Sequence, residues 1–242
     1  MLPLNRFSEF ASLTERERQL INQLADPPGI VPKNSRLRSE GDRPEAVYLL
    51  LEGWAGTSLA LPGGGRQIMR VHLPGDLMGM PSLCLEHAAE TLTAFSQIKV
   101  ATIPNARLMA LFTKAPRVAA LIFLASQRER VALMDMTASL GRSSALARLA
   151  SVLIDLHGRL RAIGLTEGNR LDLALTQEQL ADMVGVTPVH VNRTLRELEQ
   201  RGVIARHLNQ VRLIDEPALR AMAGMVERCT VRDPEWLPAA GK

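Results

Sequence analysis

Residues 175–204, LTQEQLADMVGVTPVHVNRTLRELEQRGVI, predict two short helices joined by a tight turn. Thr176 and Gln179 have the spacing of a capping box, in which each side chain satisfies a backbone N–H at the start of a helix. Gly185 supplies a residue that adopts a left-handed turn conformation without strain. Thr187 is a cap for a second helix that begins immediately. The segment therefore has the order of signals of a helix-turn-helix.

The second helix has one apolar stripe and one polar face. Pro188 suits its first turn, where a backbone N–H has no partner to lose, and Gly202 ends it. Val191, Leu195 and Leu198 recur at helical spacing and predict the side that packs on the rest of the domain. The alternative is a helical hairpin inside some other domain, with its charges merely solvated. The agreement of caps, turn, stripe and stop favours the helix-turn-helix.

The outward face near the start of the second helix has the side chains needed to read a DNA major groove. Arg193 can pair with guanine, Asn192 can pair with adenine or hold a phosphate, and Val189 can contact the methyl group of thymine. Side chains at both helix starts can bond phosphates beside free backbone N–H groups. The predicted DNA-binding residues are Thr176, Gln177, Thr187, Val189, His190, Asn192, Arg193 and Arg196.

This segment resembles the winged helix-turn-helix of the CRP/FNR superfamily of bacterial transcription regulators, and TPVHVNRTL resembles one branch of it. The resemblance puts the base-reading positions at Pro188 or Val189, at Asn192 and at Arg193. The Arg-Glu pair of the cyclic-AMP receptor members is replaced by Pro188 and Val189, and the Glu that FNR-type members place at the Val189 position is also absent. Only Arg193 carries over unchanged. The resemblance therefore implies the docking mode and leaves the operator sequence open.

Composition is compatible with such a regulator. The chain has 242 residues, of which 46% are hydrophobic, and this suits two modest domains with a core in each. Its net charge of +4 favours a polyanionic partner, and 3% aromatic residues disfavour a single-strand binder that stacks bases. Cys84 and Cys229 provide neither a metal cluster nor a disulfide framework. No uncharged apolar run of about 18 residues occurs, so we expect a cytoplasmic protein with no membrane partner.

The N-terminal half predicts a β-rich domain. Residues 7–24 predict one or two short amphipathic helices, with Thr14 and Glu17 as a second capping box. Beyond them, short apolar runs alternate with turn residues, as in an antiparallel sandwich or barrel. The runs are residues 47–51, 55–61, 67–73 and 98–103, and the glycines of 62–65 mark a hairpin tip. The order of these pieces, with the fragments LLLEGWA and LPGD, resembles the cyclic-nucleotide-binding-type β-roll of the same superfamily.

Two positions that hold a cyclic nucleotide in this kind of β-roll are altered here. The resemblance places the ribose-binding Glu at Met80, and the phosphate-binding Arg and its neighbour at Glu90 and Thr91. A carboxylate repels a phosphate, and a thioether cannot bind a ribose diol. Cyclic AMP is therefore disfavoured as an effector.

The sequence leaves room for a small-molecule effector and identifies neither it nor a cofactor. FNR-type oxygen sensing needs cysteines near the N-terminus for an iron–sulfur centre, and none precedes Cys84. Haem needs an axial ligand, for which His72, His87 or Cys84 are available. The simpler interpretation makes them a strand residue, an exposed loop residue and a small buried hydrophobe, respectively.

Residues 116–140 predict a long helix unbroken by glycine or proline. A seam with alternating spacings of four and three runs along it through Ala120, Leu124, Gln127, Val131, Met134, Ala138 and Gly141. Ile122 and Phe123 lie on other faces, so the helix should have more than one neighbour. We expect the seam to join two chains, because two recognition helices double the base contacts and require half-sites about one helical turn apart. The alternative is a helix that packs only on its own barrel.

The remaining segments complete a winged helix-turn-helix. They are a hinge at 141–144, a helix at 145–163, a strand at 170–173 and wing strands at 203–205 and 211–214. Arg206, His207 and Arg212 of the wing are candidate contacts to backbone phosphate. Asp215 caps a last helix that runs to about Arg228.

The predicted fold is α+β, with an N-terminal antiparallel, jelly-roll-like β-roll sensor domain, a long dimerisation helix and a C-terminal winged helix-turn-helix. The expected domains are residues 1–115 for the sensor, 116–141 for the dimerisation helix, 142–229 for the DNA-binding domain and 230–242 for a loose tail. The predicted function is transcription regulation by a homodimer on a palindromic operator in double-stranded DNA, with RNA polymerase recruited or blocked. The alternatives are a DNA-binding protein that ignores ligands and a cupin-like barrel enzyme. The enzyme lacks converging histidines and carboxylates, and no metal site is predicted.

Overall fold

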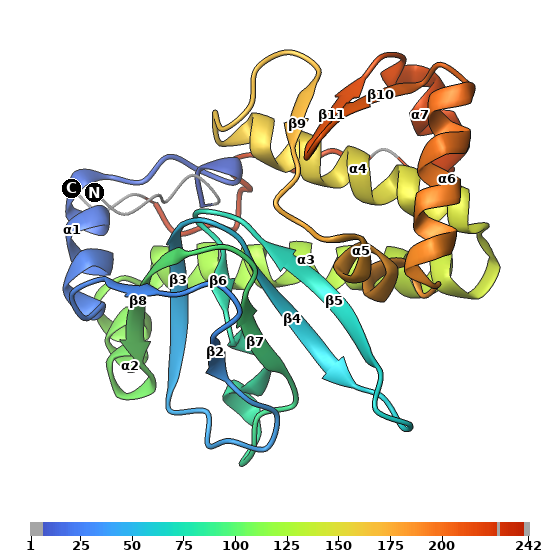
Figure 1. Cartoon of the computed structure of the whole chain (residues 1–242). Helices are drawn as coiled ribbons and strands as arrows, with labels where there is room; N and C mark the ends of the chain where they lie inside the picture. The colour runs from blue at the N-terminus through green and yellow to red at the C-terminus, as the bar shows by residue number, and fades with distance from the viewer. Residues whose placement is uncertain (1–6, 227, 240–242) are drawn as a thin grey trace. The chain divides into compact units, whose positions relative to one another are not determined.

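The computed structural model describes residues 7–226 and 228–239 (Figure 1). The chain divides into two compact units. The first comprises Met1–Gly64, Met69–Ala132 and Cys229–Lys242, and the second comprises Gly65–Ile68 and Leu133–Arg228. Strands dominate the first unit and helices the second, as the sequence predicts.

The N-terminal segment forms a short 3-10 helix, η1 (Phe7–Glu9), and the helix α1 (Glu15–Leu24). The predicted capping box is present, since Thr14 Oγ1 accepts from the backbone N–H of Glu17 and Glu17 Oε2 accepts from the backbone N–H of Thr14. Glu17 is also bound by Arg117 at 3.0 Å, and Arg117 Nη1 donates to the carbonyl of Ser12. This buried ion pair fixes the start of α1 against the long helix that follows the strands.

Two four-stranded sheets form the predicted β-roll. Its strands are β1 (Gly29–Val31), β2 (Arg36–Arg38), β3 (Ala46–Glu52), β4 (Ala55–Ala60), β5 (Arg66–His72), β6 (Leu77–Met78), β7 (Thr91–Ala94) and β8 (Ile98–Pro104). The orders are β1-β8-β3-β6 and β2-β7-β4-β5, and β1 with β8, β3 with β8 and β6, and β7 with β2 and β4 pair antiparallel. The four long runs predicted from sequence correspond to β3, β4, β5 and β8. The four short strands carry too few residues to show a period.

Apolar side chains from both sheets meet in one cluster. Its buried members are Leu50, Ala55, Met78, Leu92, Ala94, Ile98 and Val100. Leu92 and Ala94 alternate with more exposed residues along β7, whereas Leu50 and Val100 adjoin Leu49 and Ala101, which are also buried and belong to a second apolar cluster. The sheet that contains β3 and β8 is therefore apolar on both faces. The chain turns at Gly79 after β6 and forms a 3-10 helix, η2 (Met80–Cys84). It then continues to β7.

The long helix predicted after the strands is α3 (Pro116–Arg142), preceded by α2 (Asn105–Lys114). It ends two residues later than expected and includes Gly141, so the predicted hinge at 141–144 is shortened. Ser143 N–H still bonds the carbonyl of Ser139, and the break falls at Ser144, whose side chain caps the next helix. No single described helix is long and apolar enough to cross a membrane, and α2 and α3 pass that test only together, although they are bent by 118° at their junction.

The second unit is a winged helix-turn-helix. Its elements are α4 (Ala145–Ala162), β9 (Arg170–Asp172), α5 (Gln177–Val184), α6 (Pro188–Gln200), β10 (Ile204–His207), β11 (Gln210–Leu213) and α7 (Glu216–Ala223). The strands form one antiparallel sheet in the order β10-β11-β9. The last helix stops at Ala223 and not near Arg228, because Gly224 takes the left-handed conformation that ends helices. The predicted α+β fold is otherwise confirmed.

The C-terminal tail, expected to be loose, has contacts within the first unit. The backbone N–H of Asp233 donates to the carbonyl of Phe10 at 2.7 Å, and Leu237 packs on the cluster that contains Phe7 and Phe10. An apolar side chain near the end of a chain thus completes a core built from its beginning. Cys229–Lys242 accordingly group with the first unit.

Replacing Gly56 by alanine should destabilise the β-roll. Gly56 lies on β4, and a Cβ built there would lie 2.0 Å from Cζ of the buried Phe95 ring. Overpacking of this kind costs about 1–3 kcal/mol. Denaturant unfolding of the full chain measures the effect. Gly65→Ala is the matched control, because its Cβ would have no neighbour within 4 Å; equal unfolding midpoints for the two variants would contradict the assigned packing of Phe95.

Candidate nucleic-acid interface

The turn between α5 and α6 is built as its sequence predicts. Thr176 Oγ1 accepts from the backbone N–H of Gln179 at 3.1 Å, and Gln179 Oε1 accepts from the N–H of Thr176 at 2.9 Å. Gly185 follows α5 with φ 69°, in the left-handed region. Thr187 Oγ1 then accepts from the N–H of His190 at the start of α6. Three local devices therefore set the angle between the two helices.

Packing leaves one side of α6 free. Val191, Thr194, Leu195 and Leu198 are buried, as the predicted stripe requires. On the free side Val189 is 81% exposed, Arg193 and Arg196 are exposed, and Asn192 is partly buried. The structure brings these four predicted DNA-binding residues onto one face of one helix.

His190 lies at the edge of this face and not within it. Its Nδ1 is 3.0 Å from Nη2 of Arg193, and because a guanidinium only donates, this ring nitrogen is the acceptor. Its side chain also lines a cavity of about 760 Å³ beside α6 and the start of α4. The other residues of that lining include Ser143, Ser144, Arg148, Thr194, Glu197 and Arg201. His190 is thus placed to hold Arg193, which the sequence reading did not anticipate.

The predicted phosphate contacts at the helix starts are exposed. Thr176, Gln177 and Thr187 all lie on the surface. Each threonine hydroxyl accepts a backbone hydrogen bond as a cap and keeps its own O–H to donate. Cap formation and phosphate binding are therefore compatible at these two positions.

The connection between the two wing strands is shorter than expected, and Arg206 of the wing is already paired. The strands reach His207 and resume at Gln210, leaving a two-residue tip with Leu208 at φ 55° and 92% exposed. Arg206 Nη2 donates to Glu199 Oε2 of α6 at 2.6 Å, and the Arg206 backbone N–H donates to Glu199 Oε1. This hydrogen bond from Arg206 is the main cause that holds the pKa of Glu199 below its ordinary value. Of the candidate phosphate contacts, His207 and Arg212 stay exposed, whereas Arg206 anchors the wing to α6.

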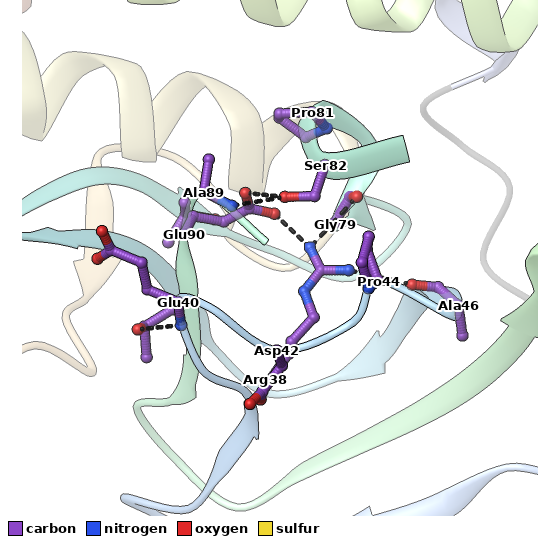
Figure 2. A network of polar contacts seen from close by, with 12 residues as sticks. Arg38, Glu40, Asp42, Pro44, Ala46, Gly79, Pro81, Ser82, Ala89 and Glu90 are labelled. Carbon is purple, nitrogen blue, oxygen red and sulfur yellow. Dashed lines mark hydrogen bonds and ion pairs between the residues drawn. The ribbon is translucent and has the colours of Figure 1, made fainter. Parts of the chain in front are cut away.

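The position expected to hold a ligand phosphate in the β-roll contains an internal ion pair (Figure 2). Glu90 is buried, Nη2 of Arg38 donates to its Oε1, and the hydroxyl of Ser82 donates to its Oε2. Met80 lies at the start of η2 and packs beside an apolar cluster. Thr91 Oγ1 accepts from the backbone N–H of Glu40. At the position where the resemblance implies a phosphate-binding Arg, the chain therefore presents a carboxylate, which repels a phosphate.

The three candidate haem ligands contact other groups of the chain or lie on its surface. His72 is buried and its Nε2 lies 2.7 Å from Thr57 Oγ1, and Nδ1 of the exposed His87 lies 3.1 Å from the carbonyl of Gly41. Cys84 is exposed, so the expectation of a small buried hydrophobe is wrong; the short η2 turn leaves its side chain on the surface. Among the residues the structure describes, no group of three or more His, Cys, Asp or Glu could hold a metal ion.

Comparison with known proteins matches both halves of the chain. Residues 30–115 match the model of the cyclic nucleotide-binding domain, and residues 147–222 match that of the Crp-like helix-turn-helix domain. The nitrogen fixation regulation protein FixK of Bradyrhizobium diazoefficiens is 31% identical over 76% of this chain and 77% of that protein. FixK of Azorhizobium caulinodans is 28% identical over 91% and 90%, respectively. The chain belongs to the CRP/FNR family of transcription regulators.

A solved structure agrees at the level of the fold. FixK2 from Bradyrhizobium japonicum superposes with a TM-score of 0.76 and 22% identity, over 84% of this chain and 99% of that one. The transcriptional activator FnrA of Stutzerimonas stutzeri is 26% identical over 88% of this chain and 87% of that protein. These relatives are regulators of transcription and not enzymes, so the cupin-like enzyme alternative is set aside.

The Glu199–Arg206 pair should weaken in acid. Because the pKa of Glu199 is lowered in the folded chain, the pair stabilises the fold at pH values above about 4.5, the ordinary glutamate value, and this stabilisation is lost as pH falls through the lowered pKa. NMR titration of labelled glutamate carboxyl carbons measures the midpoint directly. We expect the Glu199 midpoint below 4.5 in the native chain and a return toward 4.5 in Arg206→Met. A midpoint that Arg206→Met leaves unmoved would show that Arg206 is not its cause.

Proposed function

We propose that this chain is a sequence-specific transcription regulator that binds a palindromic operator in double-stranded DNA as a homodimer. The observation that carries the proposal is the face of α6 formed by Val189, Asn192, Arg193 and Arg196. It is exposed on a helix whose position is set by caps, a glycine turn and a buried stripe. A rigid helix with a free polar face is what entry into a major groove requires.

Within this face we assign Arg193 to a guanine and Asn192 to an adenine or a phosphate, with Val189 against a thymine methyl group. His190 then acts as a positioning residue, because its ring accepts from the guanidinium of Arg193. Thr176, Gln177 and Thr187 bind phosphates at the two helix starts, and Arg196 follows on the same face. The exposed wing residues His207 and Arg212 extend the phosphate contacts.

We assign the dimer interface to α3. Within this helix, all of which is described, only Arg117, Val118 and Leu121 are buried. The predicted seam, Ala120, Leu124, Gln127, Val131, Met134, Ala138 and Gly141, is partly or fully exposed in the single chain, and Met134 is 62% exposed. Leu124 also packs on the core of its own β-roll, so we assign this end of the seam in part to intrachain packing. A second copy on this stripe covers apolar surface that the single chain leaves in water.

The proposed setting follows from the family and the site. The protein works in the cytoplasm without a membrane partner, and operator position decides whether RNA polymerase is recruited or blocked. Cyclic AMP is not its effector, because Glu90 stands where the resemblance places the phosphate-binding Arg and is already paired with Arg38. The proposed organisation keeps a sensor in residues 1–115, the dimerisation helix in 116–141 and the DNA-binding domain in 142–229.

Arg193→Ala should weaken operator binding by about 1–3 kcal/mol and relax base preference at one position in each half-site, because a bidentate pair with guanine is lost. Fluorescence anisotropy on the selected operator and its single-base variants measures both effects. The control is Arg220→Ala, which removes the same charge from α7, where Arg220 is paired with Glu216. A uniform loss of affinity on all duplexes would make Arg193 a phosphate contact and refute its base-reading role.

Met134→Asp should convert the dimer into monomers. It places a charge at an exposed apolar position of the seam, where two copies would face each other and repel. Light scattering with size-exclusion chromatography measures the mass, and operator affinity should fall with it. Ser126→Asp adds the same charge on a different face of α3 and should leave a dimer. Dimers of unchanged stability in Met134→Asp would place the interface elsewhere.

A further inference from the structure

A compact polar network joins Arg38, Ser82 and Glu90 in the β-roll (Figure 2). Arg38 comes from the end of β2, Ser82 from η2, and Glu90 from the residue just before β7. The side chains of Arg38 and Glu90 are only 3% and 4% exposed, and Ser82 is fully buried. Three segments far apart in sequence therefore bring a cation, a hydroxyl and a carboxylate together out of contact with water.

The donors of this network are arranged around an anion. Arg38 and Ser82 donate to different oxygens of the same carboxylate. Ser82 Oγ in turn accepts from the backbone N–H of Ala89 at 3.1 Å, which orients its own O–H toward Glu90. A guanidinium and an oriented hydroxyl that converge on two oxygens form a site for a carboxylate or a phosphate.

The guanidinium is held in place independently of Glu90. Nη1 of Arg38 donates to the carbonyl of Ala46 at 3.2 Å, and Nη2 also donates to the carbonyl of Gly79 at 3.3 Å. Gly79 lets Arg38 lie this close, since a Cβ at Gly79 would be 2.9 Å from Nη2. Among the described residues no partner bonds the buried Nε of Arg38, which leaves a further donor on the same group. The cradle would therefore keep its form when Glu90 is removed.

We propose that Arg38 and Ser82 form an anion-binding cradle and that Glu90 fills it as an internal substitute for an acidic effector. The chain thus carries its own anion in the cradle, on the residue that the resemblance aligns with the phosphate-binding Arg. Two consequences follow. The β-roll does not respond to phosphate-bearing small molecules, and removing the Glu90 carboxylate opens a site that accepts them.

The first test uses the full chain and inorganic phosphate as the probe. Thermal unfolding is followed in phosphate and in chloride at equal ionic strength, for the native chain, Glu90→Ala and the double variant Arg38→Met/Glu90→Ala. We expect the midpoint of Glu90→Ala to rise steadily with phosphate concentration, because a ligand that binds only the folded state stabilises it. The native chain and the double variant should show no such rise. Glu86→Ala removes an exposed carboxylate from the same η2–β7 connection and should behave as the native chain.

The following results would contradict the proposal. A native chain that phosphate stabilises as much as Glu90→Ala would mean that Glu90 does not fill the cradle. A folded Glu90→Ala that phosphate leaves unchanged, or a double variant that still responds, would remove the role of Arg38. If Glu90→Ala folds in neither salt, Glu90→Ser decides the matter, because its short side chain is polar and leaves the cradle open. A phosphate response in Glu90→Ser supports the cradle, and its absence in the folded variant overturns it.

The second test connects the cradle to regulation and rests on the proposed function. Native chain that has been unfolded, desalted and refolded, and so carries no retained ligand, is titrated with the selected operator. We expect its affinity to equal that of the untreated protein and to stay within twofold when phosphate or cyclic AMP is added. An affinity that rises more than tenfold with either would contradict the internal substitute. Absence of any specific DNA binding would refute the proposed function, while the thermal test would still decide the cradle.

Discussion

The conformation of the turn between α5 and α6 is the constraint from which the proposed DNA-binding surface follows. Gly185 must adopt a left-handed conformation, which is strained for residues with a side chain, and Thr187 must cap α6 directly afterwards. With this turn in place, the buried stripe of α6 packs inward, and the opposite face therefore points to solvent. The exposure of every residue assigned to base reading therefore depends on how α6 is rotated about its own axis.

Hydrogen bonds between charged and polar side chains then distinguish residues that hold the DNA-binding surface in place from residues that form this surface. Arg206 is held by Glu199 and fixes the wing to α6, whereas His190 accepts from Arg193 and restrains a side chain that otherwise has many rotamers. The β-roll has a similar arrangement in a buried setting, where one oxygen of Glu90 accepts from Arg38 and the other from Ser82. A buried charge without such partners would cost several kcal/mol, roughly the size of a large mutational effect. Both sites therefore use ion pairs to hold geometry.

Features that depend on neighbouring residues can be predicted from the sequence, whereas contacts between residues far apart in the chain cannot. Capping boxes at Thr14 and Thr176, the long helix and the four long strands all rest on neighbours within a few positions, and the structure contains them. The Arg38–Glu90 pair joins residues 52 positions apart, and no local pattern announces it, although Glu90 was singled out as unsuited to a phosphate. The exposure of Cys84 and the packing of Leu237 on the N-terminal core depend on tertiary contacts in the same way. The last helix ends earlier than predicted because Gly224 adopts the left-handed conformation that stops it.

Selection of bound sequences from a random pool of double-stranded DNA tests the central claim most directly. If two copies of α6 present Arg193 to two major grooves, the enriched sequences will contain two inverted half-sites centred about 10–10.5 base pairs apart. Enrichment of a single unpaired half-site, or no enrichment above the pool at any salt concentration, would contradict the account.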